Sequence, residues 1–274
     1  MHTIKKHRFG PVEAFELGFG PIGPPLMTAF MYVTDGTVID TGQRRMGRYV
    51  AELLGNRRLN RILLTHHHED HSGNAGMLAR KHGAVVMGHP LMADKMRTGF
   101  NVLPYQHYMS GTAGRAEVTP FPDRITDGRL RFRPIHTPGH SRDHTVFLEE
   151  ENGWLFSGDL YLTDRVWFFR IDERIADQIA SLEKVLKYDF DALFCGHRPC
   201  PSGGKKRLRR KLEFLREFHG SVGALADSGY PEKAIIRKMR FRSDLKIRWI
   251  TMGNAGFNHM VRSSVRAHRA EKLF

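Results

Sequence analysis

The chain has 274 residues, of which 41% are hydrophobic and 26% are charged, and its formal net charge is +14. These values are ordinary for a globular protein with a substantial core, and they exclude a largely disordered chain. Two cysteines, Cys195 and Cys200, are too few for a disulfide-rich scaffold and are expected to be free thiols. No apolar segment follows the charged N-terminus, so we expect a cytoplasmic protein without a membrane partner.

Four short hydrophobic runs stop at a histidine or an aspartate. Glycine or proline turns bound these runs, which is typical of buried strands. They are residues 61–65 before His66, 130–135 before His136, 154–158 before Asp159, and 191–196 before His197. Because open α/β sheets build their sites at strand ends, we expect these side chains to meet. Imidazole and carboxylate are ligands for zinc, iron or manganese, so the sequence predicts a metal centre.

The segments between these runs are predicted to be turns and helices. Thr-Asp-Gly at residues 34–36 is typical of a hairpin turn. Residues 47–54 and 175–186 have helical periodicity, and Ser72 is a suitable N-cap for a further helix. Residues 90–120 show no regular pattern. We expect them to be an irregular segment that packs on its own aromatic side chains or lines a substrate pocket.

Most of the positive charge lies in the last quarter of the chain. Residues 204–274 contain 18 Lys and Arg against 6 Asp and Glu, which leaves only +2 on residues 1–203. We therefore expect a catalytic domain at 1–203 and a basic, mainly helical region at 204–274. Residues 205–211 would place a dense cationic patch on a helix, with further helices at 231–239 and 254–267. The patch is either a phosphate-contacting surface or a solvated helical face, and we favour the second.

The metal motifs, taken in order, resemble those of the metallo-β-lactamase superfamily. The matching strings are Val38-Ile39-Asp40-Thr41-Gly42, His66-x-His68-x-Asp70-His71, Thr137-Pro138-Gly139-His140-Ser141, Ser157-Gly158-Asp159 and Gly196-His197. The resemblance covers roughly residues 10–200. It implies an α+β fold, the four-layer αββα sandwich of that superfamily, with the basic region as a C-terminal helical extension. Members act on many substrates, so the resemblance predicts the fold and leaves the substrate open.

The resemblance also implies which side chains bind metal. The implied ligands are His66, His68 and His140 for one ion, Asp70, His71 and His197 for a second, and Asp159 as a bridge. Other polar side chains in these loops are expected to support the ligands or to face solvent, namely His67, Glu69, His136 and His144. Asp40 is expected to accept the free N–H of a ligand histidine. Tyr161 is a weaker candidate for contacting an oxyanion on the substrate.

The predicted function is a binuclear hydrolase. A hydroxide that bridges two divalent ions, with Zn²⁺ the default and Fe or Mn as alternatives, would attack a small ester, thioester or lactone, with Asp70 and Asp159 as the catalytic carboxylates. An anionic small molecule would suit this positive site. Serine nucleophile chemistry is disfavoured because the chain has no Gly-x-Ser-x-Gly elbow.

Two alternatives from other classes stay open. One is a metallonuclease that uses the basic C-terminal region to hold nucleic acid, a partner that we do not favour. The other is a non-catalytic member of the fold, or a mononuclear iron member. Among the mononuclear iron members are persulfide dioxygenases, which usually have Gly-Arg-Thr-Asp after the corresponding aspartate. In this chain Leu160-Tyr161-Leu162-Thr163-Asp164 follows Asp159, and this difference weakens the dioxygenase interpretation. The sequence does not set the oligomeric state.

Overall fold

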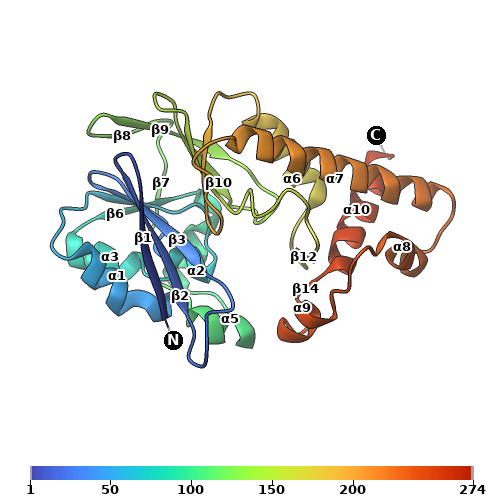
Figure 1. Ribbon diagram of the computed structural model, residues 1–274, viewed down its shortest axis with the longest axis horizontal. Helices are drawn as coiled ribbons and strands as arrows, with labels where there is room; N and C mark the ends of the chain where they lie inside the picture. Colours follow the sequence, from blue (N-terminus) through green and yellow to red (C-terminus); the bar gives the residue numbers. More distant parts are fainter. Residues whose placement is uncertain (1, 273–274) are drawn as a thin grey trace.

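The computed structural model describes residues 2–272 as two β-sheets packed face to face, with helices on both outer sides (Figure 1). The first sheet has seven strands in chain order. They are β1 (His2–Phe9), β2 (Val12–Phe19), β3 (Ala29–Val33), β4 (Thr37–Ile39), β5 (Arg61–Leu63), β6 (Val85–Gly88) and β7 (Thr119–Pro120). Strands β1 to β4 pair antiparallel, and β4 to β7 pair parallel. The predicted hairpin at residues 34–36 is therefore confirmed.

The second sheet has five strands in the order β13-β11-β10-β9-β8. They are β8 (Ile125–Asp127), β9 (Leu130–His136), β10 (Thr145–Glu149), β11 (Trp154–Gly158) and β13 (Ala192–Cys195). A separate two-stranded ribbon pairs β12 (Phe169–Arg170) with β14 (Ala255–Gly256). Because β14 lies in the basic C-terminal region, this ribbon ties that region to the segment that follows Asp159.

Helices cover the outer face of each sheet. On the first sheet lie α1 (Gly47–Leu54) and α3 (Ala75–His82). On the second lie α6 (Ile175–Val185) and α7 (Gly204–Asp227), against which α8 (Glu232–Met239) and α10 (Phe257–Glu271) pack. Shorter helices are η1 (Arg44–Met46), α2 (Glu69–Ser72), η2 (Pro90–Met92), α4 (Ala93–Thr98), α5 (Pro104–Ser110) and α9 (Leu245–Ile250). The helix–sheet–sheet–helix order confirms the predicted α+β four-layer sandwich.

The alternation of side chains along each strand explains how the sheets pack against each other and against the helices. In β2, Val12 and Ala14 face the second sheet, whereas Phe15 and Leu17 face α1 and α3 on the other side. The space between the sheets is filled mainly by the aromatic rings of Phe30, Tyr32, Phe132, Phe147, Phe156 and Phe194. Alternate residues of a strand point to opposite faces, so one strand contributes to two cores. The Tyr32 hydroxyl also donates to the Cys195 carbonyl at 2.5 Å and links the two sheets.

The C-terminal region shares a core with the second sheet. Helix α7 begins at Gly204, where the basic region was predicted to start, and buries Leu208, Leu212 and Leu215 in the cluster that also contains Leu155 of β11. The second sheet and the helices of residues 204–272 therefore share one continuous hydrophobic core. None of the helices within residues 2–272 is long and apolar enough to cross a lipid bilayer.

The structure corrects three local expectations. Ser72 does not cap the helix at residues 75–82; it ends α2, and its hydroxyl donates to the carbonyls of His67 and His68. Residues 90–120 are not irregular throughout, because a 3₁₀ turn, α4 and α5 lie within them. Lys211 does not belong to an exposed patch. It is 3% exposed and donates to the Leu160 carbonyl at 2.7 Å, and burial lowers its pKa to about 8.

We expect the Glu13 ion pairs to make stability pH-dependent at acid pH. Hydrogen bonds from Arg57 and Lys6 lower the pKa of Glu13 from 4.5 to about 2. This carboxylate therefore stabilises the fold above pH 4.5, and that contribution is lost as pH falls towards 2. Glu13→Gln should lower the free energy of unfolding at pH 7 by roughly 1 kcal/mol, with the difference vanishing near pH 2. Denaturant unfolding of the unmodified protein and of Glu13→Gln between pH 7 and pH 2 measures this difference. A difference in the free energy of unfolding that stays constant with pH would contradict a stabilising role for the Glu13 ion pairs.

Candidate metal centre

The predicted ligand residues follow strands of both sheets and meet between them. His66, His68, Asp70 and His71 follow β5, on a loop that turns into α2. The other three ligands come from the second sheet: His140 from the loop after β9, Asp159 directly after β11, and His197 after β13. The Phe30 amide donates to the Gly196 carbonyl at 2.8 Å, which holds the β13 loop against the first sheet. The centre thus lies where the two sheets are joined.

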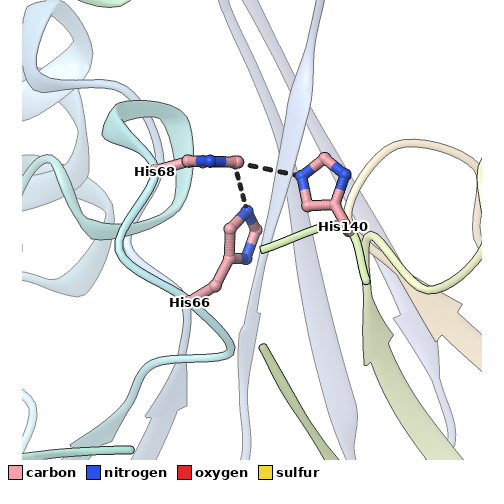
Figure 2. A group of neighbouring side chains, drawn as sticks. All are labelled: His66, His68 and His140. Atoms are coloured by element: carbon pink, nitrogen blue, oxygen red, sulfur yellow. Dashed lines mark hydrogen bonds between the residues drawn. The ribbon is translucent and has the colours of Figure 1, made fainter. Parts of the chain in front are cut away.

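Three imidazoles form the first group of converging nitrogens (Figure 2). His66 Nε2 lies 2.8 Å from His68 Nδ1, and His140 Nε2 lies 3.0 Å from the same atom. All three side chains are buried, between 0% and 7% exposed. Burial and neighbouring positive charge lower the pKa of His66 and His68 well below 6.5. The lowered pKa values favour the neutral form of the His66 and His68 rings, which is the form that binds metal.

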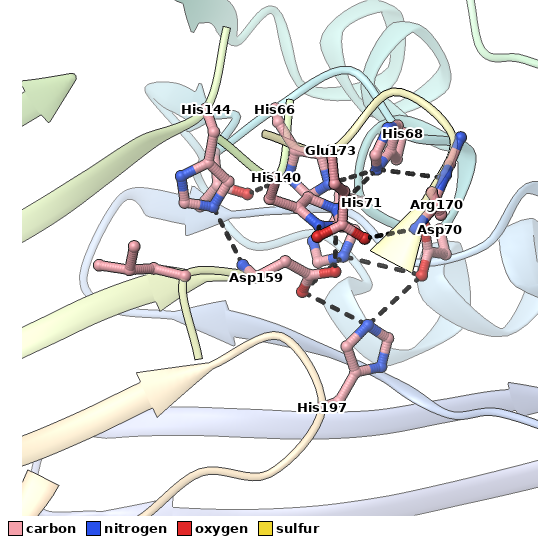
Figure 3. A network of polar contacts seen from close by, with 12 residues as sticks. His66, His68, Asp70, His71, His140, His144, Asp159, Arg170, Glu173 and His197 are labelled. Carbon is pink, nitrogen blue, oxygen red and sulfur yellow. Dashed lines mark hydrogen bonds and ion pairs between the residues drawn. The ribbon is translucent and has the colours of Figure 1, made fainter. Parts of the chain in front are cut away.

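The second group joins two histidines to two carboxylates (Figure 3). Asp70 Oδ2 lies 3.7 Å from His71 Nε2 and 3.6 Å from His197 Nε2. Asp159 Oδ1 lies 3.3 Å and 3.4 Å from the same two nitrogens. Burial opposes a charged His71, but the nearby carboxylates outweigh it and raise its pKa well above 6.5. The same negative field would attract a divalent cation.

Asp159 belongs to both groups. While its Oδ1 faces His71 and His197, its Oδ2 lies 3.4 Å from His140 Nε2 in the first group. The two oxygens of one carboxylate thus point to different sets of imidazoles. This is the geometry that a carboxylate between two neighbouring cations requires.

The polar atoms of the centre fit metal ions. His68 Nε2, His71 Nε2 and Asp159 Oδ1 are buried and have no hydrogen-bond partner within residues 2–272. Unsatisfied buried polar atoms are costly and usually mark a functional site or a bound ion. His68 Nδ1 faces two imidazole nitrogens at once, and its one lone pair or proton satisfies only one of them. Clusters of histidine and aspartate with this donor chemistry could hold metal ions.

Asp40 supports the centre from the end of β4. Its Oδ2 lies 2.8 Å from His71 Nδ1, and its carboxylate also accepts from the Thr65 amide and hydroxyl. The contact fixes the His71 ring with Nε2 turned towards Asp70 and Asp159. Asp40 adopts a φ of 55°, which is uncommon for a residue other than glycine and typical of strained functional positions.

The neighbouring polar residues hold the ligand loops in place. The His67 ring and amide contact Asp143, and Glu69 accepts from Gln106. His144 Nε2 accepts the Asp159 amide at 3.0 Å, so this ring supports a ligand residue, one of the two roles expected for it. His136 is directed away and contacts the Arg142 carbonyl.

Gly196 is required by the closeness of the ligands. A Cβ atom at this position would lie 2.5 Å from His71 Cε1 and 2.6 Å from Asp159 Oδ1. Real Cβ contacts do not become this short, so a side chain here would displace two of the converging residues. The Gly196-His197 string is thus explained by packing as well as by ligation.

Tyr161 is the one predicted site residue that the structure places elsewhere. Its ring lies in the core under α7, its hydroxyl donates to Asp164 at 2.5 Å, and Arg207 donates to that hydroxyl at 3.4 Å. Burial and the bond to Asp164 raise its pKa to about 12. The structure does not bring this phenol to the converging ligands, because its hydroxyl contacts Asp164 and Arg207 of α7.

Sequence reasoning missed two residues beside the centre, Arg170 and Glu173 (Figure 3). Arg170 Nη1 lies 3.5 Å from His68 Nδ1, and its buried Nε has no hydrogen-bond partner within the described chain. Glu173 Oε2 lies 3.6 Å from His140 Nδ1. Both belong to or follow the β12 strand, which pairs with β14 from far along the chain. No local motif indicates such a position, since it depends on a long-range pairing.

Comparison with known proteins agrees with this geometry. The lactamase-like protein notP of Aspergillus sp. (strain MF297-2) is 32% identical over 239 residues, 82% of this chain and 65% of that protein. A hydroxyacylglutathione hydrolase of Halorhodospira halophila is 28% identical over 58% of this chain and 59% of that protein. An atrochrysone carboxyl ACP thioesterase of Aspergillus fumigatus is 33% identical over 37% of this chain and 20% of that protein. The chain thus spans less than two thirds of each relative.

A solved structure shows the same fold. A metallo-β-lactamase family protein from Thermus thermophilus superposes with a TM-score of 0.65 at 22% identity and covers 94% of both chains. The family model of the metallo-β-lactamase superfamily matches residues 26–197, which span all seven converging ligand residues. Because this match covers more than half of the chain, the protein belongs to the metallo-β-lactamase superfamily, whose members are mainly hydrolases.

Proposed function

We propose that this protein is a binuclear, zinc-dependent hydrolase of small ester or thioester substrates. The observation that carries the proposal is the position of Asp159, whose two carboxylate oxygens face separate groups of imidazoles. His66, His68 and His140 would hold one ion, and Asp70, His71 and His197 the other. Histidine and carboxylate ligands without a redox partner suit Zn²⁺ best, with Fe and Mn as alternatives.

The chain's own residues would prepare the site for acyl transfer to water. Bound divalent ions would supply a hydroxide at neutral pH and an electrophile for the carbonyl oxygen. Asp40 and His144 would keep His71 and Asp159 in their orientations. Arg170, beside His68, would stabilise negative charge that develops on the substrate oxygen or on the leaving group. The burial of the centre limits competing water and strengthens these interactions.

A thioester is the favoured bond among the candidates. Two relatives carry names that point to such chemistry, a hydroxyacylglutathione hydrolase and an ACP thioesterase. A thiolate is a better leaving group than an alkoxide, so a site with a nucleophile and an oxyanion partner needs no strong general acid. Cys195 offers no competing nucleophile, because burial raises its pKa to about 12.

The nuclease alternative depends on the basic run at residues 205–211, and the structure reduces the charge available there. Lys205 pairs with Asp189, while Arg207 and Arg210 pair with Asp164. Lys206 and Arg209 are the exposed cations of this run that make no ion pair within residues 2–272. Two free charges favour a solvated helical face over a surface that tracks a phosphate backbone.

We expect Asp159→Asn to remove most of the bound metal and activity. The substitution keeps the side-chain volume but removes the charge that would hold two cations close together. Metal content should fall from about two ions per chain, and turnover of a model thioester should fall by at least about a hundredfold. Elemental analysis and a thioesterase assay measure both quantities. Asp177→Asn, at a partly exposed aspartate paired with Arg174, is the matched control. Wild-type metal content in Asp159→Asn would rule out the binuclear proposal.

A second expectation separates two histidines of one loop region. His140→Ala should lose one ion and nearly all activity, because His140 faces both His68 and Asp159. His136→Ala should keep its metal and most of its rate, because the ring contacts the Arg142 carbonyl. Elemental analysis of both variants provides the comparison. Equal loss of metal from both would mean that the ligand assignment of this loop is mistaken.

The third expectation concerns nucleic acid. If α7 holds a phosphate backbone, Lys206→Gln/Arg209→Gln should weaken binding of single-stranded RNA, and the salt dependence of affinity should become shallower by about 0.7 per lost contact. We expect instead that the unmodified protein has no sub-micromolar affinity for RNA or DNA near physiological salt, and that the variant keeps its thioesterase rate. Fluorescence anisotropy of a labelled RNA, measured over a salt series with both proteins, decides between binding through α7 and the absence of sub-micromolar binding.

A further inference from the structure

A hollow of about 660 Å³ lies beside the ligand loop but does not include any ligand residue. Its walls come from η1, α3 and the segments that follow α4 and α5. The lining residues are Arg44, Arg80, Thr98, Gly99, Phe100, Asn101, Thr112, Ala113 and Arg115. A hollow of this size is within the range of small-molecule sites.

The hollow gathers positive charge without a counter-charge. Arg44, Arg80 and Arg115 are exposed, no Asp or Glu lines the hollow, and none of the three arginines makes an ion pair within residues 2–272. Nearby arginines behave differently, since Arg48 and Arg97 pair with carboxylates on their own helices. Three like charges facing one space repel each other, and a bound anion would relieve that repulsion. Guanidinium groups bind phosphate through paired hydrogen bonds.

Backbone packing, and not a loose loop, brings these arginines together. A Cβ atom on Gly76 would lie 1.8 Å from the Arg115 carbonyl oxygen, so the segment at residues 112–115 rests directly on α3. The Ala116 amide then donates to the Met96 carbonyl at 3.0 Å and fastens the end of this segment to α4. The positions of Arg80 and Arg115 are thereby fixed by the main chain.

Phe100 connects the wall of the hollow to the metal centre by side-chain packing. The Phe100 ring packs edge-on against His67 with centroids 5.0 Å apart, and the His67 and His68 rings lie 4.9 Å apart. Only two ring contacts thus separate the wall of the hollow from a predicted metal ligand. A ligand anchored by the arginines would need an extended arm that passes around the Phe100 and His67 rings to reach His68.

We propose that this arginine-lined hollow binds the phosphates of coenzyme A, and that the substrates are acyl-CoA thioesters. The inference rests on the proposed thioesterase function and names its substrate class. Coenzyme A carries a 3′-phosphate and a pyrophosphate at one end and the thioester at the end of a long pantetheine arm. The phosphopantetheine arm of an acyl carrier protein, by contrast, carries a single phosphodiester. The charge of three arginines is matched better by the phosphates of coenzyme A than by that one group.

The reaction is a balanced hydrolysis. Water adds to the acyl carbon, the carbon–sulfur bond breaks, and a carbon–oxygen bond forms in its place. The products are a carboxylic acid and the free thiol of coenzyme A, with a proton from water transferred to sulfur. No oxidant or reductant is needed.

Binding of free coenzyme A tests the hollow without turnover. We compare the full chain with the triple variant Arg44→Gln/Arg80→Gln/Arg115→Gln by isothermal titration calorimetry at fixed ionic strength. The matched control is Arg58→Gln/Arg129→Gln/Arg266→Gln, which removes three exposed, unpaired arginines elsewhere in residues 2–272. The hollow variant should bind coenzyme A at least about tenfold more weakly, whereas the control should change less than about threefold. Dephospho-coenzyme A should bind the unmodified protein more weakly than coenzyme A does.

Activity assays separate this inference from the proposed function. On an acyl-CoA the hollow variant should show a raised KM, and on an N-acetylcysteamine thioester, which has no phosphate, its rate should match the unmodified protein. Coenzyme A binding that is absent, or equal in both triple variants, overturns the inference even if thioesters are hydrolysed. If only the hollow variant loses coenzyme A binding, and neither the unmodified protein nor the variants hydrolyse thioesters, the coenzyme A site is supported and the proposed thioesterase function is refuted.

Two further outcomes are decisive. If a phosphopantetheinylated carrier protein or RNA binds through the arginines and coenzyme A does not, the assignment to coenzyme A is wrong. If the triple variant is unfolded by circular dichroism, Arg80→Gln alone replaces it, because this exposed side chain at the end of α3 has no partner within the described chain. An unchanged affinity in that single variant would also count against the proposal.

Discussion

The shared carboxylate of Asp159 sets the constraint on which the rest of the structure depends. One side chain from the end of β11 must reach imidazoles that follow β5, β9 and β13, so strands of two different sheets must end at the same place. The aromatic core between the sheets fixes their separation, and the Phe30–Gly196 hydrogen bond fixes the edge where they meet. Close packing then dictates small residues around the ligands, as Gly196 shows.

The sequence predicted the centre well because the ligands lie in short local strings. His66 to His71 occupy one loop, and each remaining ligand directly follows a glycine, as in Gly158-Asp159. Periodicity and ligand type marked the strand ends, whereas the choice of His140 over His136 and His144 came from the resemblance of Thr137-Pro138-Gly139-His140 to the superfamily motif. The helix at residues 47–54 was likewise predictable, because its apolar spacing is regular and the structure keeps it unchanged.

What the sequence could not predict depends on contacts between distant segments. Arg170 is brought beside His68 by the pairing of β12 with β14, which joins residues about 86 positions apart. Tyr161 was misplaced because its partners, Asp164 and Arg207, come from a loop and from α7. Lys211 was counted as surface charge, since a run of seven mostly basic residues gives no sign of which one turns inward. Burial of this kind is a tertiary property, and a local pattern does not encode it.

The ribbon of β12 and β14 bears on the order in which the site is completed during synthesis. All seven converging ligand residues precede residue 198, so they are synthesised before any part of α7. Lys211, which donates to the Leu160 carbonyl next to Asp159, is made later. Strand β12 gains its partner β14 only when residues 255 and 256 have been made. A nascent chain can therefore contain all seven converging residues while Arg170, the cation beside His68, still lacks the strand that pairs with its own. The position of Arg170 is thus completed only after residues 255 and 256 have been made.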